Sequence, residues 1–138
     1  MAKREYSKNP DRWLDYAKQD LEYAEDTIQR DHPIFRYTCY FSQQSAEKAI
    51  KAALVMLQID FDEVYNLDAL AAMLPAGWGL RDHPIDLHSL IEWADEDGSP
   101  AERFDDPSEE NAVENVTLAR KVMVVMLNDI QQHGHPVH

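Results

Sequence analysis

The sequence predicts an all-α domain, arranged as an up-down four-helix bundle with one extra short helix. Apolar residues recur at spacings of three and four along most of the chain. Prolines and glycines interrupt this pattern at intervals, and no segment alternates between apolar and polar residues as a strand does. The 138 residues fit a single domain, residues 1–138, with flexible ends expected at 1–9 and 133–138. A chain of this length forms a core without disulfides or a metal.

The first expected helix spans residues 11–29. Asp11 follows Pro10 and suits the N-cap position. Pro33 disfavours helical geometry in the residue before it, so the helix ends before that point. Residues three and four positions apart form the apolar face, namely Trp13, Ala17, Leu21, Ala24 and Ile28.

The second expected helix spans residues 34–58 and suits the middle of the bundle. Many of its inward-facing side chains are small, which lets a neighbouring helix approach closely. The inner face consists of Phe35, Cys39, Ser42, Ala46, Ala49, Ile50, Ala53 and Leu57. Since each residue turns the helix by about 100°, a separate polar stripe carries Gln44, Glu47, Lys48 and Lys51.

Three further helices complete the expected bundle. A short one spans 63–74 and ends at Pro75, and another spans 84–96 with Pro84 in its first turn. An acidic loop follows, and the last helix spans 108–132 with Ser108 as its N-cap. The inner stripe of the last helix consists of Ala112, Val116, Ala119, Met123, Met126, Leu127 and Ile130.

The charge and composition narrow the classes of partner. The formal net charge is −13, from 26 acidic and 13 basic residues, so the chain repels nucleic acid on average. DNA is therefore not an expected partner and RNA is disfavoured. A local basic site would still suit a small phosphorylated ligand, and the acidic surface would suit a basic protein. One cysteine, no signal peptide and no long apolar run together indicate a cytoplasmic protein without membrane contact.

Several segments of the chain together carry a family resemblance. Tyr16–Ala24 and Phe41–Ala52, the latter with the run Gln-Gln-x-x-Glu-Lys-x-x-Lys, resemble the first two helices of a HEPN domain. The name stands for higher eukaryotes and prokaryotes nucleotide-binding. Glu102-Arg103-Phe104 and the final helix over Ala112–Ile130 extend the resemblance to nearly the whole chain, although Asn66 replaces a histidine that is frequent in the family. The resemblance implies a four-helix bundle, a homodimer and a nucleotidyltransferase-like partner, in some cases as toxin and antitoxin.

Several branches of the HEPN family are metal-independent ribonucleases that use an arginine, a polar residue and a nearby histidine. Here no histidine follows Arg103 or Arg120 at that spacing, and the next one along the chain is His133. The run that fits the spacing holds Arg81 and His88. His88 would act as general acid or base, and Arg81 would stabilise the developing phosphorane charge. Because this run precedes the expected helix 84–96 and not the last helix, it is an alternative and not the leading interpretation.

Gln44, Glu47, Lys48, Lys51 and Arg103 are the candidate site residues. Two ammonium groups can hold phosphate oxygens, while the amide and the carboxylate hydrogen-bond a base or a ribose. The same stripe also fits a partner or intersubunit surface, or a solvated helix face with a Glu47–Lys51 pair contributing roughly 0.3–0.5 kcal/mol. No cofactor is required, and a nucleotide is the candidate ligand.

The histidines near the C-terminus do not predict a metal site. His133, His135 and His138 lie on a segment with glycine and proline, without a scaffold that would orient them as ligands.

The leading hypothesis is a HEPN-like nucleotide-binding or protein-interaction module that pairs with a nucleotidyltransferase-like partner, in a toxin–antitoxin-type or related system. Under this hypothesis no residue is assigned as catalytic. Two alternatives remain open. One is a ribonuclease toxin that uses Arg81 and His88, and the other is a stand-alone dimer whose helices only preserve the fold.

Overall fold

A computed structural model describes residues 7–62, 64, 66–93 and 106–135. In these ranges the regular structure consists of helices and includes no strand, so the all-α prediction is confirmed. Three helices are long, namely α1 (Pro10–Ile28), α2 (Phe35–Met56) and α6 (Glu109–Gln132). Three are short, namely α3 (Leu67–Ala72), α4 (Gly79–Asp82) and α5 (His88–Glu92).

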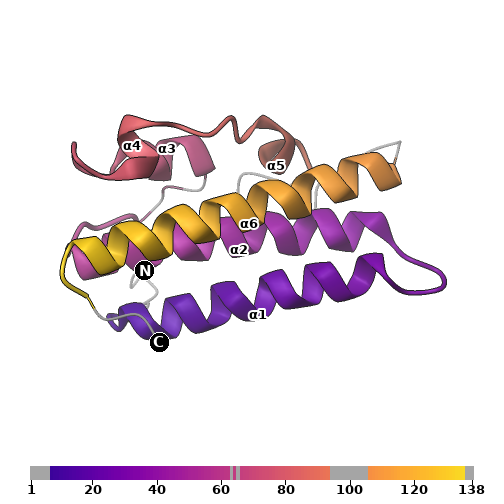
Figure 1. Ribbon diagram of the computed structural model, residues 1–138, viewed down its shortest axis with the longest axis horizontal. Coiled ribbons are helices and arrows are strands. Elements are labelled where there is room, and N and C mark those ends of the chain that lie inside the picture. The colour runs from indigo at the N-terminus through magenta and orange to yellow at the C-terminus, as the bar shows by residue number, and fades with distance from the viewer. Residues whose placement is uncertain (1–6, 63, 65, 94–105, 136–138) are drawn as a thin grey trace, which may run out of the picture.

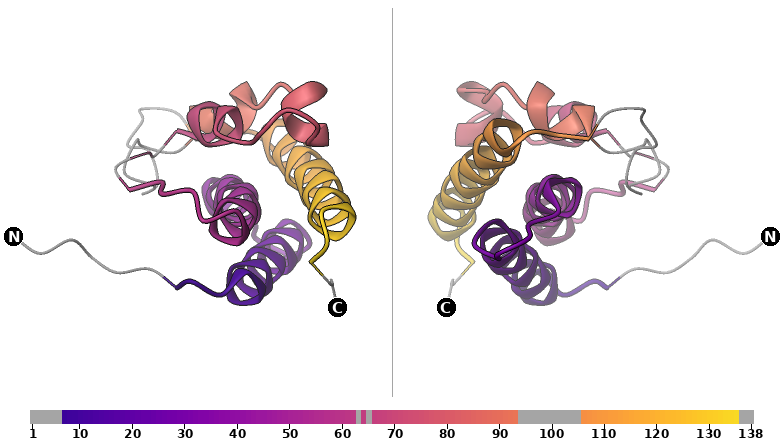
Figure 2. Two further views of the ribbon diagram at one scale, coloured as in Figure 1. Left: turned by 90° about the vertical axis from the view of Figure 1, so that its left-hand side faces the viewer. Right: turned by 90° about the vertical axis from the view of Figure 1, so that its right-hand side faces the viewer.

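The chain follows an up-down-up-down course in which the third position holds the three short helices. Figure 1 shows α1 and α2 running antiparallel, with α6 parallel to α2. The chain returns through α3, α4 and α5, which contact α2 and α6. The end-on views in Figure 2 place this short-helix layer on one side of the three long helices. The bundle therefore has three long helices and one layer of short helices, where the sequence predicted one medium helix and one short helix.

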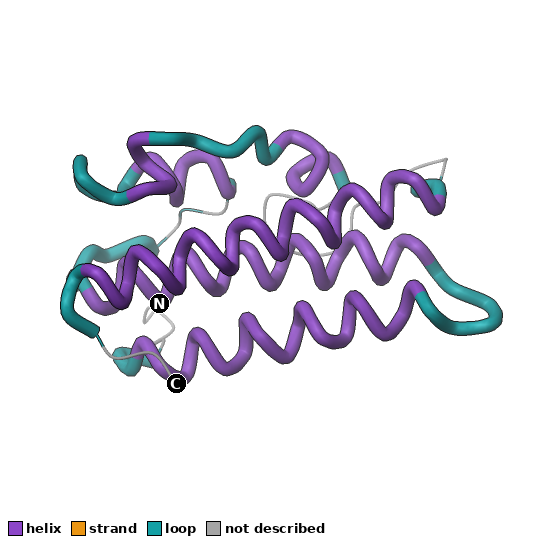
Figure 3. The backbone as a smooth tube through the Cα atoms, in the orientation of Figure 1, coloured by secondary structure: helices purple, strands orange, loops and turns teal. Residues whose placement is uncertain are grey.

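The prediction of a helix over residues 84–96 is wrong for residues 84–87. Helical geometry begins only at His88, whose backbone N–H donates to Asp86 Oδ1 at 3.0 Å. The expected helix 63–74 is also shorter, because Asn66 caps α3 by accepting from the backbone N–H of Asp68 and Ala69. The segment 75–79, predicted only to end a helix, leads directly into α4. Figure 3 shows the loops that separate these short helices.

The caps of the long helices explain where they begin. Ser108 starts α6 with a capping box, in which its Oγ accepts from Asn111 N and Asn111 Oδ1 accepts from Ser108 N. At α1 the predicted cap is wrong by two residues. Asn9 accepts from Asp11 N at 3.0 Å, and Pro10 takes the first helical position, where a missing N–H has no cost.

Helix α2 is the centre of the core, as its small residues predicted. Its residues from Ser42 to Val55 are buried almost without interruption. The small side chains allow close packing of α1 and α6, and Ser45 Oγ donates to the backbone oxygen of Ala17 at 2.8 Å. The alanines with no exposed surface on α2 are Ala46, Ala49, Ala52 and Ala53.

The C-terminal part of α6 fixes the short-helix layer. The buried carboxylate of Asp129 accepts from the backbone N–H of Gly79 at 2.9 Å and of Leu80 at 3.2 Å. A Cβ on Gly79 would lie 2.9 Å from Asp129 Oδ1, so a larger residue here would displace the carboxylate. Beside it, the buried ring of Trp78 stacks on the His133 ring with centroids 4.4 Å apart.

Two histidines of the expected C-terminal tail contact the bundle. His133 stacks on Trp78, and His135 Nε2 lies 2.9 Å from Asp11 Oδ1 at the start of α1. This second contact holds the end of the fold against its beginning. Residues 136–138 and 1–6 lie outside the described ranges.

In the part of the chain that the structure describes, no helix is both long enough and apolar enough to cross a bilayer.

Candidate functional site

The predicted polar stripe of α2 faces α1 and is largely buried. Gln44 is 9% exposed and Glu47 is 7% exposed, so a solvated helix face is the wrong interpretation for these two residues. The Lys48 ammonium pairs with the Asp20 carboxylate of α1. Lys51 Nζ lies 3.4 Å from Glu47 Oε2. The stripe therefore holds one ion pair between α1 and α2, Lys48 with Asp20, and one ion pair within α2, Lys51 with Glu47.

Lys51 is also surrounded by aromatic rings. Its ammonium lies 5.1 Å from the Phe61 ring centroid and 5.8 Å from that of Trp13. The two rings meet edge to face at 87°. The faces of aromatic rings attract a cation, and the attraction grows when water is excluded. Lys51 is thus stabilised by one carboxylate and two rings of its own chain.

Four of the five predicted site residues are brought together by α2. Gln44 Nε2 donates to Gln43 Oε1 at 2.7 Å, in the same buried region as Glu47. Both lysines have carboxylate partners, so a phosphate could bind them only by competing with Asp20 and Glu47. The fifth residue, Arg103, lies outside the described residues.

An exposed aromatic face adjoins this stripe, and sequence reasoning did not identify it. We define the α1–α2 aromatic face as Tyr16, Tyr23, Tyr37, Tyr40 and Phe41. Tyr23 and Tyr40 contact Phe41 with centroid distances of 4.6 Å and 5.1 Å. Tyr16, Tyr23 and Tyr37 are 40%, 43% and 40% exposed. The seven-residue spacing of Tyr16 and Tyr23 on one helix was the available signal.

Three arginines lie over tyrosines of this face. Each arginine lies within seven residues of its tyrosine in the sequence. The distances between the guanidinium carbon and the ring centroid are 5.5 Å for Arg12 over Tyr16, 5.5 Å for Arg30 over Tyr23 and 5.2 Å for Arg36 over Tyr37. A hydrogen bond to Asp26, together with the nearby Tyr23, raises the pKa of Arg30 above its ordinary value. These contacts orient planar cations beside exposed rings.

The alternative ribonuclease residues are not joined by the described structure. Arg81 belongs to α4 and His88 begins α5, and both are exposed. Arg81 lines a small hollow of about 140 Å³ near α3, and His88 is not among the residues that line it. Among the described residues no hydrogen bond or ion pair connects the two side chains.

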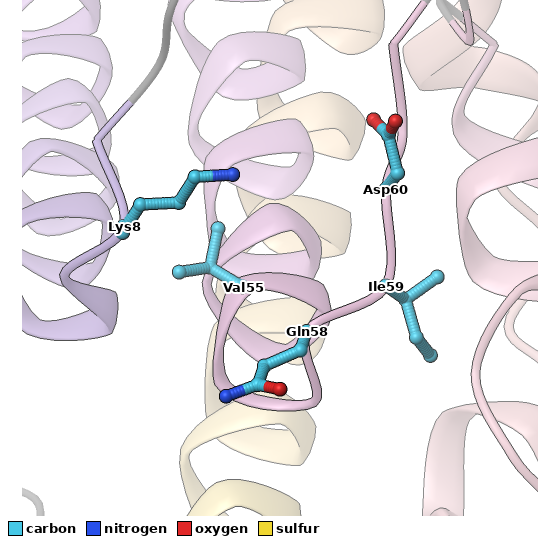
Figure 4. A pocket seen from close by; sticks show the side chains of 5 residues that line it. All are labelled: Lys8, Val55, Gln58, Ile59 and Asp60. Atoms are coloured by element: carbon cyan, nitrogen blue, oxygen red, sulfur yellow. The ribbon is translucent and has the colours of Figure 1, made fainter.

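A larger pocket of about 410 Å³ lies at the C-terminal end of α2, and Lys8, Val55, Gln58, Ile59 and Asp60 line it. Figure 4 shows Lys8 and Asp60 on opposite sides of Val55. Gln58 has a φ of 59°, the left-handed conformation that commonly ends a helix. The volume is within the range of small-molecule sites, but none of the predicted site residues lines this pocket.

The described residues hold no group of three or more histidine, cysteine, aspartate or glutamate side chains that could bind a metal ion.

Cys39 on α2 is buried beneath α5 and α6, and burial raises the pKa of its thiol to about 11. The neighbouring side chain of Asn115 opposes this shift, and the charge of Glu92 adds to it. The thiolate is the nucleophilic form of cysteine. Cys39 is therefore a packing residue, as the sequence indicated, and not a nucleophile.

We expect Cys39 in the folded protein to resist alkylation by iodoacetamide near pH 8. With the pKa at about 11, on the order of one thiol in a thousand is ionised there. Mass spectrometry after timed labelling measures the reaction, and the same chain unfolded in urea is the control that should react quickly. Rapid labelling of the folded protein would contradict the assignment.

The raised pKa of Cys39 also has a defined effect on stability. The unfolded thiol, with an ordinary pKa of 9.0, loses its proton at a lower pH than the folded thiol at about 11. The folded state therefore binds more protons in this window, and the free energy of unfolding falls as the pH rises from 9 to 11. A Cys39→Ala variant should lack this component of the alkaline decline.

With the geometry defined, the chain can be placed in a family. The family model for the HEPN domain matches residues 10–130, which is nearly the whole chain. The chain belongs to the HEPN domain family, and its all-α fold agrees with the resemblance seen in the sequence. No curated protein and no solved structure gives a match to the chain.

Proposed function

We propose that the chain is a HEPN-type interaction module that pairs with a nucleotidyltransferase-like partner through the α1–α2 aromatic face. The observation that carries the proposal is the exposure of Tyr16, Tyr23 and Tyr37, each beside an arginine. Tyrosine and arginine are enriched at protein interfaces and supply much of their binding energy. The partly buried Lys48–Asp20 ion pair beside the face joins α2 to α1.

The overall charge supports a basic partner surface. The net charge of −13 attracts a basic protein and speeds its association at low salt. HEPN domains commonly dimerise, and we expect a homodimer here as well. Such pairs can work as toxin and antitoxin, and this setting is part of the proposal.

The experiment is co-expression of the chain with a nucleotidyltransferase-like protein encoded beside it, followed by size-exclusion chromatography with light scattering. The masses separate a complex of the two proteins from a homodimer. A Tyr23→Ser/Tyr37→Ser double variant should weaken the complex by at least tenfold, because it removes two exposed rings. The matched control is Val124→Ser, an exposed apolar residue at 62% on α6.

A complex that tolerates the double variant but not Val124→Ser would place the partner on α6 and overturn the proposed face. If no neighbouring nucleotidyltransferase-like protein binds the chain, the pairing itself is wrong.

Nucleotide binding is the second candidate function, and the clustering of Gln44, Glu47, Lys48 and Lys51 supports it. Thermal-shift titration with ATP, ADP, AMP and GTP tests it, since a ligand that binds only the folded state raises the melting temperature with concentration. The shift should disappear in Lys48→Ala/Lys51→Ala and persist in Lys121→Ala, an exposed lysine of α6. No shift at millimolar nucleotide would leave the stripe as a structural or partner surface.

A further inference from the structure

Asn115 on α6 is a polar residue in an apolar place. It has no exposed surface, and neither Oδ1 nor Nδ2 hydrogen-bonds another atom of the described chain. One helical turn before it, Ala112 packs with Cys39 and Trp93 in a small buried cluster. The nearby Cys39 thiol is affected by Asn115, but a thiol is only a weak hydrogen-bonding partner.

The energetic cost of this arrangement requires an explanation. A buried polar group without a partner costs about 1–3 kcal/mol, and the amide has both donors and an acceptor to satisfy. Native proteins leave few such groups unpaired. A partner for Asn115 must therefore both donate and accept hydrogen bonds.

The complete burial of Asn115 limits the size of the partner that can reach its amide. Because Asn115 is 0% exposed, a larger ligand has no access to its amide. Water is small enough, both donates and accepts, and typically makes about three hydrogen bonds when it is buried in a protein. We propose that an internal water molecule binds the Asn115 amide at the junction of α2, α5 and α6.

This water would stabilise the contact between the long helices and the short-helix layer. Asn115 belongs to α6, Cys39 belongs to α2, and Trp93 follows α5 and brings a buried indole N–H to the same cluster. Asn115 and the thiol supply the two or more polar partners that a buried water needs. The inference does not depend on the proposed function, because it concerns the interior of the bundle.

The test is a water-to-protein nuclear Overhauser measurement on ¹⁵N-labelled protein. The side-chain amide protons of Asn115 should show a cross-peak to water with the sign of a long-lived bound molecule. Asn111 is the control, because this half-buried residue lies in the first turn of α6 at the surface of the bundle and its Oδ1 accepts from Ser108; it should show only the sign of fast-exchanging water. Since the thiol proton could relay the signal by exchange, the cross-peak must persist in Cys39→Ala.

A second measurement counts the internal water molecules and compares the count between the unchanged chain and a variant. Water-¹⁷O magnetic relaxation dispersion counts long-lived internal waters, and Asn115→Leu should lower the count by one. If Asn115→Leu does not fold, a high-resolution crystal structure of the unchanged chain decides, with water density expected within about 3.2 Å of Oδ1 and Nδ2. A dry amide, or an amide bonded to another part of the chain, would overturn the proposal.

Discussion

Replacement of Trp78 by alanine is expected to lower the free energy of unfolding by about 3–5 kcal/mol, the usual cost of deleting a buried aromatic side chain. Trp78 is 2% exposed and lies at the start of α4, against the end of α6. Its loss removes core volume and the stacking contact with His133 together. Thermal unfolding followed by circular dichroism should show a melting temperature lower by roughly 10–20 °C.

Trp78→Phe is the control for this prediction, because it keeps a ring in the same space and should cost clearly less than alanine. His133→Ala removes only the stacking partner and should cost less again, since His133 is exposed. A Trp78→Ala protein that melts like the unchanged chain would show that the short-helix layer does not depend on this ring.

The second large effect is expected at Asp129. Asp129→Ala leaves the backbone N–H groups of Gly79 and Leu80 without their acceptor, in a region where Leu80 is buried. Each unmade buried bond costs about 1–3 kcal/mol, so the variant should lose roughly 2–4 kcal/mol in urea unfolding. Gly79→Ala should lower the free energy of unfolding by a similar amount, because its Cβ would lie 2.9 Å from the same carboxylate.

Asn128→Ala is the matched control, since it changes an exposed neighbour on the same turn of α6. A double variant of Gly79→Ala and Asp129→Ala should cost less than the sum of the two single changes, because both disturb one contact. Full additivity would mean that the carboxylate does not act through Gly79.

The long helices were predictable because each has its own periodic apolar face. The inner stripe of α6 is buried at Ala112, Val116, Ala119, Met123, Met126 and Ile130, as the sequence indicated, and the seventh predicted member, Leu127, is half-buried. The short helices were predicted only in part. Helices α3 and α5 lie within the expected helices 63–74 and 84–96, but their bounds were wrong, and α4 was missed because four residues leave no periodic pattern. Their positions depend on tertiary contacts, such as Asp129 with Gly79, between residues 50 positions apart in the chain.

The sequence predicted which residues of α2 lie together in the candidate site, but not which side chains of other segments surround them. Helical spacing alone places Glu47, Lys48 and Lys51 together. It cannot show that Asp20 on α1 takes Lys48, or that Trp13 and Phe61 surround Lys51. Asn115 was missed because a single polar residue barely alters the periodic pattern of a long apolar stripe.

The burial of α2 on several sides has a consequence for how the molecule opens. Its backbone between Ser42 and Val55 is covered by α1, α6 and the short-helix layer at once. Amide hydrogens there can exchange with solvent only when the whole bundle unfolds, so they report the global free energy. The α3–α5 segment contributes Leu70, Trp78 and Leu80 to the same buried core, so we expect its buried amides to exchange together with those of α2 and not in a separate, earlier opening.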